Sequence, residues 1–254
     1  MLGGNSLLHF VAAMATAKKK SKARPPSPEP AEVAPEGRQR RRMSAQDREE
    51  LILREATSYF AENGLSAGTI ELARRIGITQ PLLYKYFPTK EALLERIYER
   101  LMPQTWNPAW LLLLEDDTIP LRQRLKDFYS DYTDSVLTYE HVRLFLFSGL
   151  GHHKFNAQYY GILTKRIFER IARALRREYG RTRSSHAVTK AELEEVQSLH
   201  ASIYHLAFRR WVHGEQMTDL HDLVGRKVDI FLHGIANAAQ PGRRKSRPEL
   251  PRMQ

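Results

Sequence analysis

The feature that most constrains the fold is a long stretch without proline, which extends from Leu121 to Gln240. Within it, apolar residues recur every three and four positions, as in Tyr160, Leu163 and Ile167, which is the spacing of one face of an α-helix. No segment alternates apolar and polar residues with the period of two that a half-buried β-strand requires. We therefore predict an all-α protein whose C-terminal part is a bundle of long helices.

Four long helices are expected in this part of the chain, each marked by apolar residues at helical spacing. Gly180 and Gly214 follow the second and the third of them, and a glycine after a helix is a common terminator because it adopts a positive φ readily. The apolar residues that mark the four helices span 121–139, 160–174, 196–210 and 220–238.

Four shorter helices are expected ahead of that stretch. Ser44, Thr79 and Thr89 stand where hydroxyl side chains cap the first turns of the first, third and fourth of these helices. Gly64 and Gly77 stand where the first and second helices end, and we expect both in the left-handed conformation. The second and third helices are expected over 69–76 and 80–87.

The net charge of +11 lies mostly at the two ends of the chain. Residues 1–42 hold nine Lys and Arg against three Glu, and residues 241–254 hold five against one, which leaves the body with a net charge of +1. Five of the 13 prolines lie between Pro25 and Pro35, so we expect a disordered arm there. Such an arm either stays solvated or contacts DNA phosphates without sequence preference.

The sequence offers no pattern of catalytic or metal-binding residues. The absence of cysteine excludes disulfides and thiolate metal sites. None of the ten histidines has another histidine three or four positions away, so His152 and His153 lack the companions of a zinc site. The glycines of 148–151 do not form a dinucleotide-binding loop and are expected to end a helix. We therefore expect no catalytic residue, no metal and no cofactor.

The stretch Thr69 to Pro88, TIELARRIGITQPLLYKYFP, has the pattern of a helix-turn-helix. Ala73 is small enough for a second helix to cross the first at close range, and Gly77 tolerates the positive φ of the turn. The residues expected in the core between the two helices are Leu72, Ile76, Ile78, Leu83 and Phe87. The residues expected on the opposite side of the second helix are Thr79, Gln80, Tyr84 and Lys85.

These segments resemble the TetR family of bacterial transcriptional regulators. The matching pieces are Phe60 to Gly64, Leu72 to Thr79 and Leu83 to Leu93, and the last contains Leu-Tyr-x-Tyr-Phe-x-[Ser/Thr]-Lys-Glu, the most specific of them. The resemblance covers residues 44–101, and beyond them only size and helical content are similar to the family. The connection from Gly64 to Ala73 is one residue shorter than the usual spacing of the family.

The resemblance implies that the second helix of the motif contacts the major groove of DNA. There, Gln80 can pair with adenine and Lys85 can reach the acceptor atoms of guanine. Tyr84, Tyr86 and Lys90 resemble the family residues that contact phosphates. The short connection leaves open whether Thr69 caps its helix and contacts a phosphate. The implied DNA-binding residues are Thr69, Thr79, Gln80, Pro81, Tyr84, Lys85, Tyr86 and Lys90.

By the same resemblance, the last two long helices, Thr189 to His213 and Leu220 to Ala239, would pair with those of a second copy. Gly225 and Gly234 indicate close helix approach, because glycine inside a helix costs about 1 kcal/mol. Aromatic residues of the bundle either line an effector pocket or form plain core. The candidate ligand-binding residues are Tyr129, Tyr132, Phe145, Phe147, Phe168 and Trp211.

A basic helix face is expected to be solvated, although a long anionic effector can use it. Its residues are Lys165, Arg166, Arg170, Arg173, Arg176 and Arg177.

We interpret the chain as a cytoplasmic, ligand-responsive repressor without a membrane partner. It would bind an inverted-repeat operator as a homodimer through the helix Gln80 to Phe87, and an unknown small molecule would release it. The alternative is a DNA-binding regulator without an effector, in which the aromatic residues are solid core. The expected domains are a disordered basic arm (1–43), the helix-turn-helix domain (44–101), an effector-binding and dimerisation domain (102–240) and a disordered basic tail (241–254).

Overall fold

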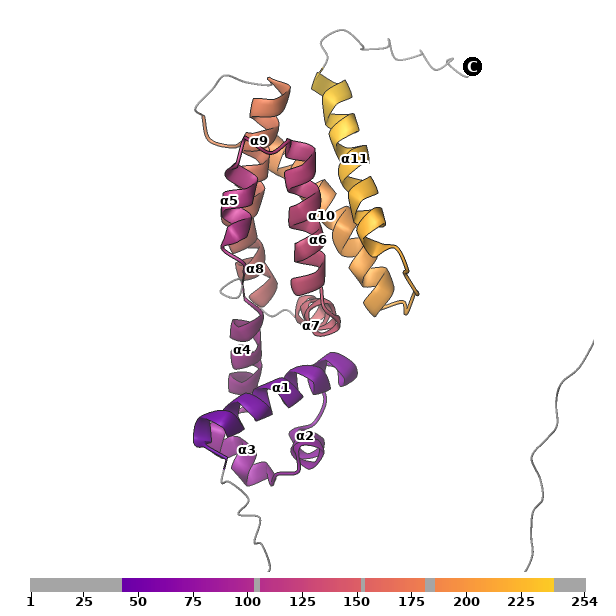
Figure 1. Ribbon diagram of the computed structural model, residues 1–254. Helices are drawn as coiled ribbons and strands as arrows, with labels where there is room; N and C mark the ends of the chain where they lie inside the picture. Colours follow the sequence, from indigo (N-terminus) through magenta and orange to yellow (C-terminus); the bar gives the residue numbers. More distant parts are fainter. Residues whose placement is uncertain (1–42, 103–105, 152–153, 181–185, 240–254) are drawn as a thin grey trace, which may run out of the picture. The chain divides into compact units, whose positions relative to one another are not determined.

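The computed structural model describes residues 43–102, 106–151, 154–180 and 186–239, and every regular element in these ranges is a helix (Figure 1). This confirms the predicted all-α fold. His152, His153, the expected tail and all but the last residue of the expected arm lie outside the described residues. The helices are α1 (Ala45–Asn63), α2 (Thr69–Ile76), α3 (Gln80–Tyr86), α4 (Lys90–Leu101), α5 (Ala109–Glu115), α6 (Leu121–Ser135), α7 (Tyr139–Leu150), α8 (Phe155–Leu163), the π-helix η2 (Thr164–Phe168), α9 (Glu169–Tyr179), α10 (Lys190–Trp211) and α11 (Leu220–Ala239).

The predicted caps of the short helices are present. Ser44, Thr79 and Thr89 each accept a backbone N–H of the first turn of α1, α3 and α4, respectively. Gly77 ends α2 in the left-handed conformation, with φ 75° and ψ 32°. Gly64 ends α1 with φ 82° and ψ 164°, so the prediction of a left-handed helical residue is wrong at this position. The large ψ directs the chain away from α1 into an extended segment.

The predicted helix over 121–139 is two helices, because the chain turns between α6 and α7. Thr138 caps α7 by accepting the backbone N–H of His141, and its own N–H donates to the Val136 carbonyl at 2.8 Å. Val136 and Leu137 are buried in the turn, so the apolar spacing continues through it and conceals the break. α5, a short helix that buries Trp110, was not predicted from the sequence.

The segment over 155–179 is helical throughout, and η2 stands between α8 and α9. A π-helix is a local widening of an α-helix, and such turns occur frequently at functional sites. Gly180, with φ 60° and ψ 21°, ends α9 as predicted. α10 and α11 confirm the last two long helices, and α7 ends at Leu150, as expected for residues 148–151.

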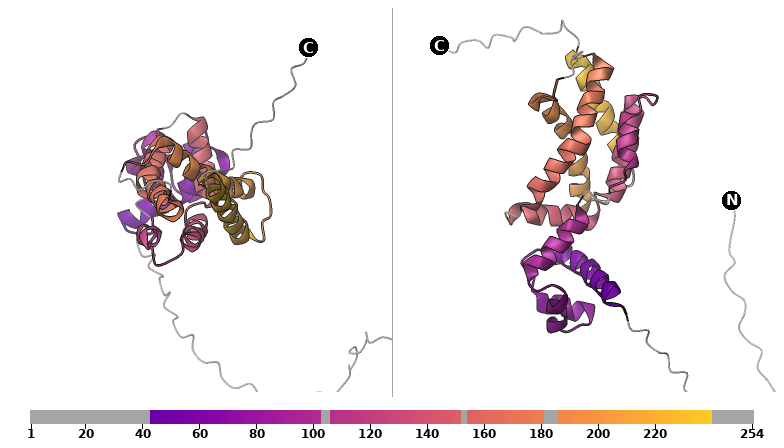
Figure 2. Two further views of the ribbon diagram at one scale, coloured as in Figure 1. Left: turned by 90° about the horizontal axis from the view of Figure 1, so that it is seen from above. Right: turned by 90° about the vertical axis from the view of Figure 1, so that its left-hand side faces the viewer.

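The helices α5 to α11 form a bundle in which α6 packs against α5 and α11, and α10 packs against α7, α9 and α11 (Figure 2). The helices α1 to α4, called here the four-helix unit, meet the bundle where α1 packs against α7. Residues from Met43 onward belong to one compact unit of the chain, so the proposed division near residue 101 stays a prediction. No helix in the described ranges combines the length and the apolar character that a membrane span needs.

The contact between α6 and α11 is held by charge as well as by apolar packing. Asp229 accepts from Arg122 at 2.7 and 2.9 Å and from Lys126 at 2.8 Å. A Cβ atom on Gly225 would lie 3.6 Å from the Lys126 side chain, which is an ordinary contact, and a Cβ on Gly234 would have no described atom within 4 Å. The close helix approach expected at Gly234 is therefore not formed among the described residues of this chain.

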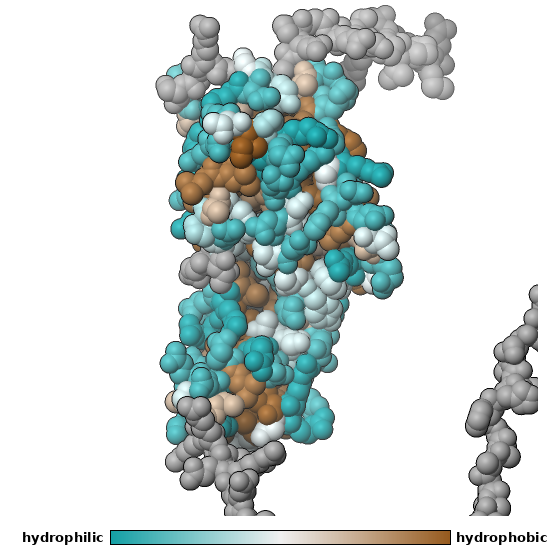
Figure 3. All heavy atoms as spheres, in the orientation of Figure 1, coloured by the Kyte–Doolittle hydropathy of each residue, from teal (hydrophilic) through white to brown (hydrophobic). Residues whose placement is uncertain are grey.

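The face shown in Figure 3 is mostly polar, and one of its groups of apolar side chains lies where Figure 1 places α5. Leu112 on this helix is 73% exposed, and Leu111 and Leu113 are partly buried against the core.

Candidate nucleic-acid interface and ligand site

The turn between α2 and α3 has the geometry that the sequence predicts. Ala73 is buried where the helices meet, and its carbonyl accepts the N–H of Ile78 at 3.0 Å across the left-handed Gly77. Of the predicted interhelical core, Leu72, Leu83 and Phe87 are buried, whereas Ile76 and Ile78 are half-buried. The helix-turn-helix thus holds α3 rigidly on one side and leaves its other side at the surface.

The candidate DNA-binding residues differ in exposure. Those whose side chains are exposed are Thr79, Pro81 and Lys85, and those that are half-buried are Gln80, Tyr84, Tyr86 and Lys90. Tyr86 packs against the hydrophobic core, so its ring belongs partly to the interior of the four-helix unit. The surface that α3 presents is therefore formed chiefly by its first turn and by Lys85.

Thr69 is buried at 7% exposure and connects the start of α2 to α3. Its Oγ1 shares a hydrogen bond of 2.9 Å with the Tyr84 hydroxyl and accepts the Gln80 Nε2–H at 3.1 Å. Gly68, not Thr69, is the N-cap residue of α2. Three candidate DNA-binding residues are thus joined to one another. This link was not recognised in the sequence because the three positions are far apart along the chain.

Lys90 is bound inside the four-helix unit. Its Nζ donates to the Ala67 carbonyl at 2.8 Å and lies 5.6 Å from the centroid of the Phe60 ring. One of its three N–H bonds is used in this way, and the others remain for an external acceptor.

Most arginines of the four-helix unit are neutralised by carboxylates. Arg75 binds Glu62 at 2.5 Å and thereby lowers the pKa of that carboxyl group. Within the described residues, Lys85 forms no ion pair. The other arginine pairs of this unit are Arg54–Glu55, Arg74–Glu71, Arg96–Glu49, Arg96–Glu99 and Arg100–Glu50.

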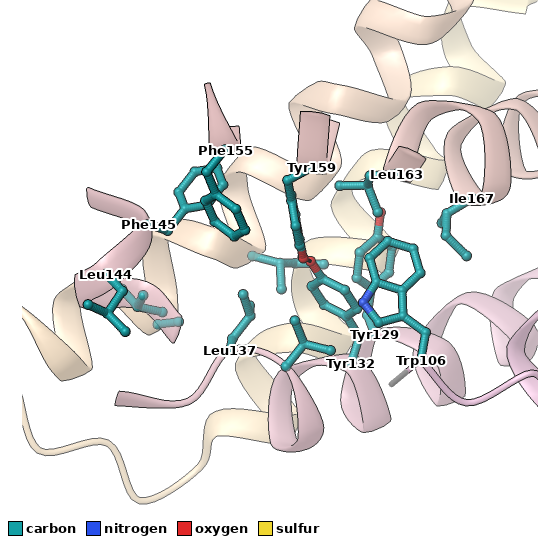
Figure 4. Close-up of a cluster of buried hydrophobic side chains, with 14 of the residues drawn as sticks. Trp106, Tyr129, Tyr132, Leu137, Leu144, Phe145, Phe155, Tyr159, Leu163 and Ile167 are labelled. Carbon is teal, nitrogen blue, oxygen red and sulfur yellow. Dashed lines mark hydrogen bonds between the residues drawn. The ribbon is translucent and has the colours of Figure 1, made fainter. Parts of the chain in front are cut away.

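Three of the candidate ligand-binding residues meet inside the bundle, around His200 of α10. The ring centroids of Tyr129, Tyr132 and Phe168 lie 6.2, 5.4 and 5.1 Å from the imidazole. All three rings are fully buried. Figure 4 shows the Tyr132 hydroxyl meeting that of Tyr159, at 2.6 Å, with Trp106 and Tyr129 beside them.

The other three candidates lie elsewhere. Phe145 packs next to this group, with its ring centroid 5.4 Å from that of Tyr159. Phe147 lies beneath the Arg143 guanidinium, 5.5 Å from it, at the contact between α1 and α7. Trp211 ends α10 and donates its indole N–H to the Leu137 carbonyl at 2.8 Å. The structure therefore does not bring the six predicted residues into one site.

His141 and His200 are buried histidines that the sequence analysis did not select. Burial lowers the pKa of His141 to about 4 and that of His200 to about 3, so both are neutral near pH 7. Their sequence signal is position: His200 follows the buried Leu199 and precedes the buried Ile203 on the apolar face of α10. The described residues contain no group of three potential ligands that could hold a metal ion.

A pocket of about 450 Å³ opens between η2 and α10. Three buried polar atoms of the aromatic residues in the bundle have no hydrogen-bond partner among the described residues: His200 Nδ1, on a residue that lines the pocket, the Tyr129 hydroxyl and Trp106 Nε1. The residues that line the pocket are Tyr160, Phe168, Glu194, Gln197, Ser198, His200 and Ala201.

Arg143 of α7 joins the ends of two helices. Its Nε donates to the Ala61 carbonyl at the end of α1 at 2.6 Å, and its other nitrogens lie 3.4 Å from the Glu62 carbonyl and 3.5 Å from that of Trp211. A guanidinium group is suited to this place because the C-terminal end of a helix carries partial negative charge. The last turns of α1 and α10 are thus bound to one side chain.

Known proteins resemble the chain in two ways. Residues 52–97 match the family model described as bacterial regulatory proteins, tetR family. Over 71 residues the chain is 38% identical to the HTH-type transcriptional regulator EthR of Mycobacterium tuberculosis, and the match covers 28% of this chain. The chain spans about a third of the length of such curated relatives, 33% for EthR.

The whole fold is similar to solved structures. A TetR-like transcriptional regulator from Rhodococcus sp. RHA1 superimposes with a TM-score of 0.55 at 17% identity, over 76% of this chain and 100% of that one. A TetR family transcriptional regulator from Pseudomonas syringae gives a TM-score of 0.54 at 20% identity, over 75% and 97%. At these identities the similarity establishes the arrangement of helices.

Proposed function

The chain belongs to the TetR family of bacterial regulatory proteins, and on that premise we propose that it is a ligand-responsive repressor. It binds an inverted-repeat DNA operator as a homodimer, and a small molecule releases it. The observation that carries this proposal is the helix-turn-helix, in which the buried Ala73 and the left-handed Gly77 hold α3 at the surface. We propose no catalytic residue, cofactor or metal.

α3 is the helix that enters the major groove. The Gln80 amide can pair bidentately with adenine, and its hydrogen bond to Thr69 limits the directions in which it points. Lys85 is exposed and free of carboxylates within the described residues, so it is available to guanine or phosphate. Tyr84 and the N-terminal end of α4, with Lys90, are placed for phosphate contacts.

Because most arginines of the four-helix unit bind carboxylates, one copy offers few cations to DNA. Affinity would then come from a few directed contacts, doubled by a second copy, together with phosphate contacts of the basic arm over residues 1–42. We propose that α10 and α11 form the dimer interface. Ile230 on α11 is 68% exposed, and the open space beside Gly234 leaves room for a partner helix.

We propose that the effector binds at the pocket beside α10. The Arg143 contacts support a coupling between this pocket and the DNA-binding helices. Arg143 binds both the end of α10 and the end of α1, so a movement of α10 would displace Arg143 and, with it, the end of α1. In one arrangement of the dimer the two α3 helices do not match the spacing of the operator. An effector that binds this arrangement more tightly increases its population and so lowers the fraction of protein bound to DNA. The alternative, a regulator without an effector, is favoured by the complete burial of Tyr129 and Tyr132.

The test of DNA recognition measures how tightly single variants bind a duplex selected by the full chain from a random pool and how tightly they bind duplex of random sequence. Gln80→Ala and Lys85→Ala are expected to weaken specific binding by about 1 to 3 kcal/mol while changing random binding much less. Lys90→Ala should weaken both alike and reduce the salt dependence by about one ion. Lys165→Ala is the matched control, since it removes the same charge from the exposed side of η2. Equal losses on both duplexes for Gln80→Ala would contradict the assignment.

A further inference from the structure

The pocket beside α10 indicates what kind of molecule it accepts, and this inference rests on the proposed function. We propose that the effector is an uncharged molecule of two or three rings whose hydroxyl or carbonyl oxygen bonds to the unpartnered polar atoms of His200 and Tyr129. Its rings would lie against Tyr160 and Phe168 at the pocket wall.

The first support is the set of unpartnered polar atoms. Tyr129 and His200 are 0% and 4% exposed, yet the hydroxyl and Nδ1 have no hydrogen-bond partner among the described residues. A buried polar atom left without a partner costs about 1 to 3 kcal/mol, and such atoms are rare in folded proteins. A ligand oxygen that bonds to one of them recovers part of that cost, which gives the site a specific reason to bind an oxygen-bearing molecule.

The second support is the position of these atoms relative to the pocket. His200 and Phe168 line the pocket, and their rings are 5.1 Å apart. The Tyr129 ring lies 6.2 Å from that of His200, and the Trp106 ring lies 6.3 Å from that of Tyr132. As Figure 4 shows, Trp106, Tyr129 and Tyr132 gather in one region of the core. A molecule in the pocket would therefore contact His200 directly, with the Tyr129 ring next to it.

The π-helix η2 is an independent sign of a binding site. It ends at Phe168, so the widened turn carries one wall of the pocket directly. Extra residues of this kind disturb the regular hydrogen bonding of a helix and are found frequently where a protein binds a ligand.

The third support is charge, which excludes ionic ligands from the inner end. His141 and His200 are neutral there near pH 7, because burial lowers the pKa of each. Glu194 at the exposed rim is the one charged side chain among the lining residues that the structure describes. Taking a carboxylate or an ammonium group out of water without an opposite charge is costly. A neutral ligand avoids this cost.

Four of the six residues of the basic helix face are paired with carboxylates, and Lys165 and Arg166 have no ion pair among the described residues. Arg170 binds Glu115 at 2.8 Å, and Arg177 binds Asp117 at 3.1 Å. Arg176 is buried and binds Glu192. These pairs leave little of the basic face for a long anionic effector, which is the competing hypothesis.

The experiment uses the full chain and four probes with the same ring system: 2-naphthol, naphthalene, 2-naphthoate and 2-naphthylmethylammonium. Binding is followed by calorimetry and by quenching of tryptophan fluorescence. We expect 2-naphthol to bind at least about tenfold more tightly than either ion. We also expect it to bind more tightly than naphthalene, by the factor of three to ten that one hydrogen bond supplies.

Tyr129→Phe removes one hydroxyl and keeps the ring. We expect this variant to bind 2-naphthol about threefold to tenfold more weakly and to bind naphthalene with unchanged affinity. Tyr59→Phe is the matched control, because that hydroxyl donates to Gly68 within the four-helix unit. A probe series in which the control and Tyr129→Phe behave alike would overturn the proposed contact.

The outcomes separate this inference from the proposed function. Tighter binding of 2-naphthoate than of 2-naphthol, or no binding of 2-naphthol, overturns the ligand class even if the chain still selects one DNA sequence. If the chain shows no sequence preference on DNA while 2-naphthol binds as expected, the regulator proposal fails and the site remains.

Discussion

The four-helix unit and the bundle differ in how their buried polar atoms are satisfied. In the four-helix unit, the Tyr59 hydroxyl donates to the Gly68 carbonyl at 3.0 Å, and Thr69 bonds to both Tyr84 and Gln80. In the bundle, Tyr129 and His200 hold buried polar atoms without a partner among the described residues. In these examples the four-helix unit pairs its polar side chains internally, whereas the bundle keeps two buried polar atoms that the proposed ligand can bind.

The largest expected effect comes from weakening the core of the four-helix unit. Leu83→Ala empties a position of α3 that is 1% exposed, and we expect a loss of about 2 to 5 kcal/mol in the free energy of unfolding. DNA binding should be lost because α3 is no longer held against α2. Urea unfolding and binding to a selected duplex measure the two effects.

The same variant tests how separate the two regions are. Binding of 2-naphthol by Leu83→Ala should stay within about twofold of the unchanged chain wherever the protein remains folded. A parallel loss of ligand binding would show that the bundle depends on the four-helix unit, which would contradict the distinction between the two regions.

Acid should act mainly on the bundle, because residues 44–101 contain no histidine. The pKa of His141 and of His200 is lower in the folded chain than its unfolded value near 6.5, so the unfolded state takes up protons first as the pH falls. Stability is therefore fully present above about pH 6.5 and decreases below it. At pH 5 each of the two histidines should lower the free energy of unfolding by about 2 kcal/mol relative to its value at pH 7 and above.

His200→Phe provides the control for this pH dependence. It keeps a ring of similar size and removes one titrating group, so the decrease in stability between pH 7 and pH 5 should be about half as large. Urea unfolding at the two pH values measures it. An unchanged decrease would show that His200 is not buried in the neutral form.

Two matched tyrosine variants are expected to change the free energy of unfolding by smaller amounts that differ between the two regions. Tyr59→Phe removes a hydroxyl that is hydrogen-bonded and should lower the free energy of unfolding by about 1 kcal/mol. Tyr129→Phe removes an unpartnered hydroxyl and should leave stability unchanged or raise it. Equal losses in thermal unfolding would mean that the two regions do not differ in this respect.

The smallest effect is expected at Thr69. Thr69→Val keeps the shape of the side chain and removes the oxygen that joins Gln80 to Tyr84, so specific DNA binding should weaken about threefold to tenfold. Random DNA should be bound as before. A uniform loss on both would indicate that Thr69 contacts a phosphate instead.

The four-helix unit could be predicted closely because its signals are local. Ser44, Thr79 and Thr89 cap helices in their own first turns, and Gly77 marks the left-handed turn that joins α2 to α3. These interactions extend over three or four residues, so the sequence alone reveals them.

The bundle could be predicted only in outline. The break before Thr138 was hidden because Val136 and Leu137 continue the apolar spacing through the turn. The convergence of Tyr129, Phe168 and His200 depends on how three separate helices pack, which periodicity does not determine. The same holds for Arg143, whose partners lie 82 and 68 positions away.

The most direct test of the account is to select bound duplexes from a random pool with the full chain and to sequence them. We expect an enriched inverted repeat whose half-sites are centred about one helical turn apart, roughly 34 to 36 Å. We also expect Gln80→Ala to select a pool with weaker preference at the positions that α3 contacts. A pool without any enriched sequence, or the same enrichment with Gln80→Ala, would contradict the proposal that α3 recognises DNA.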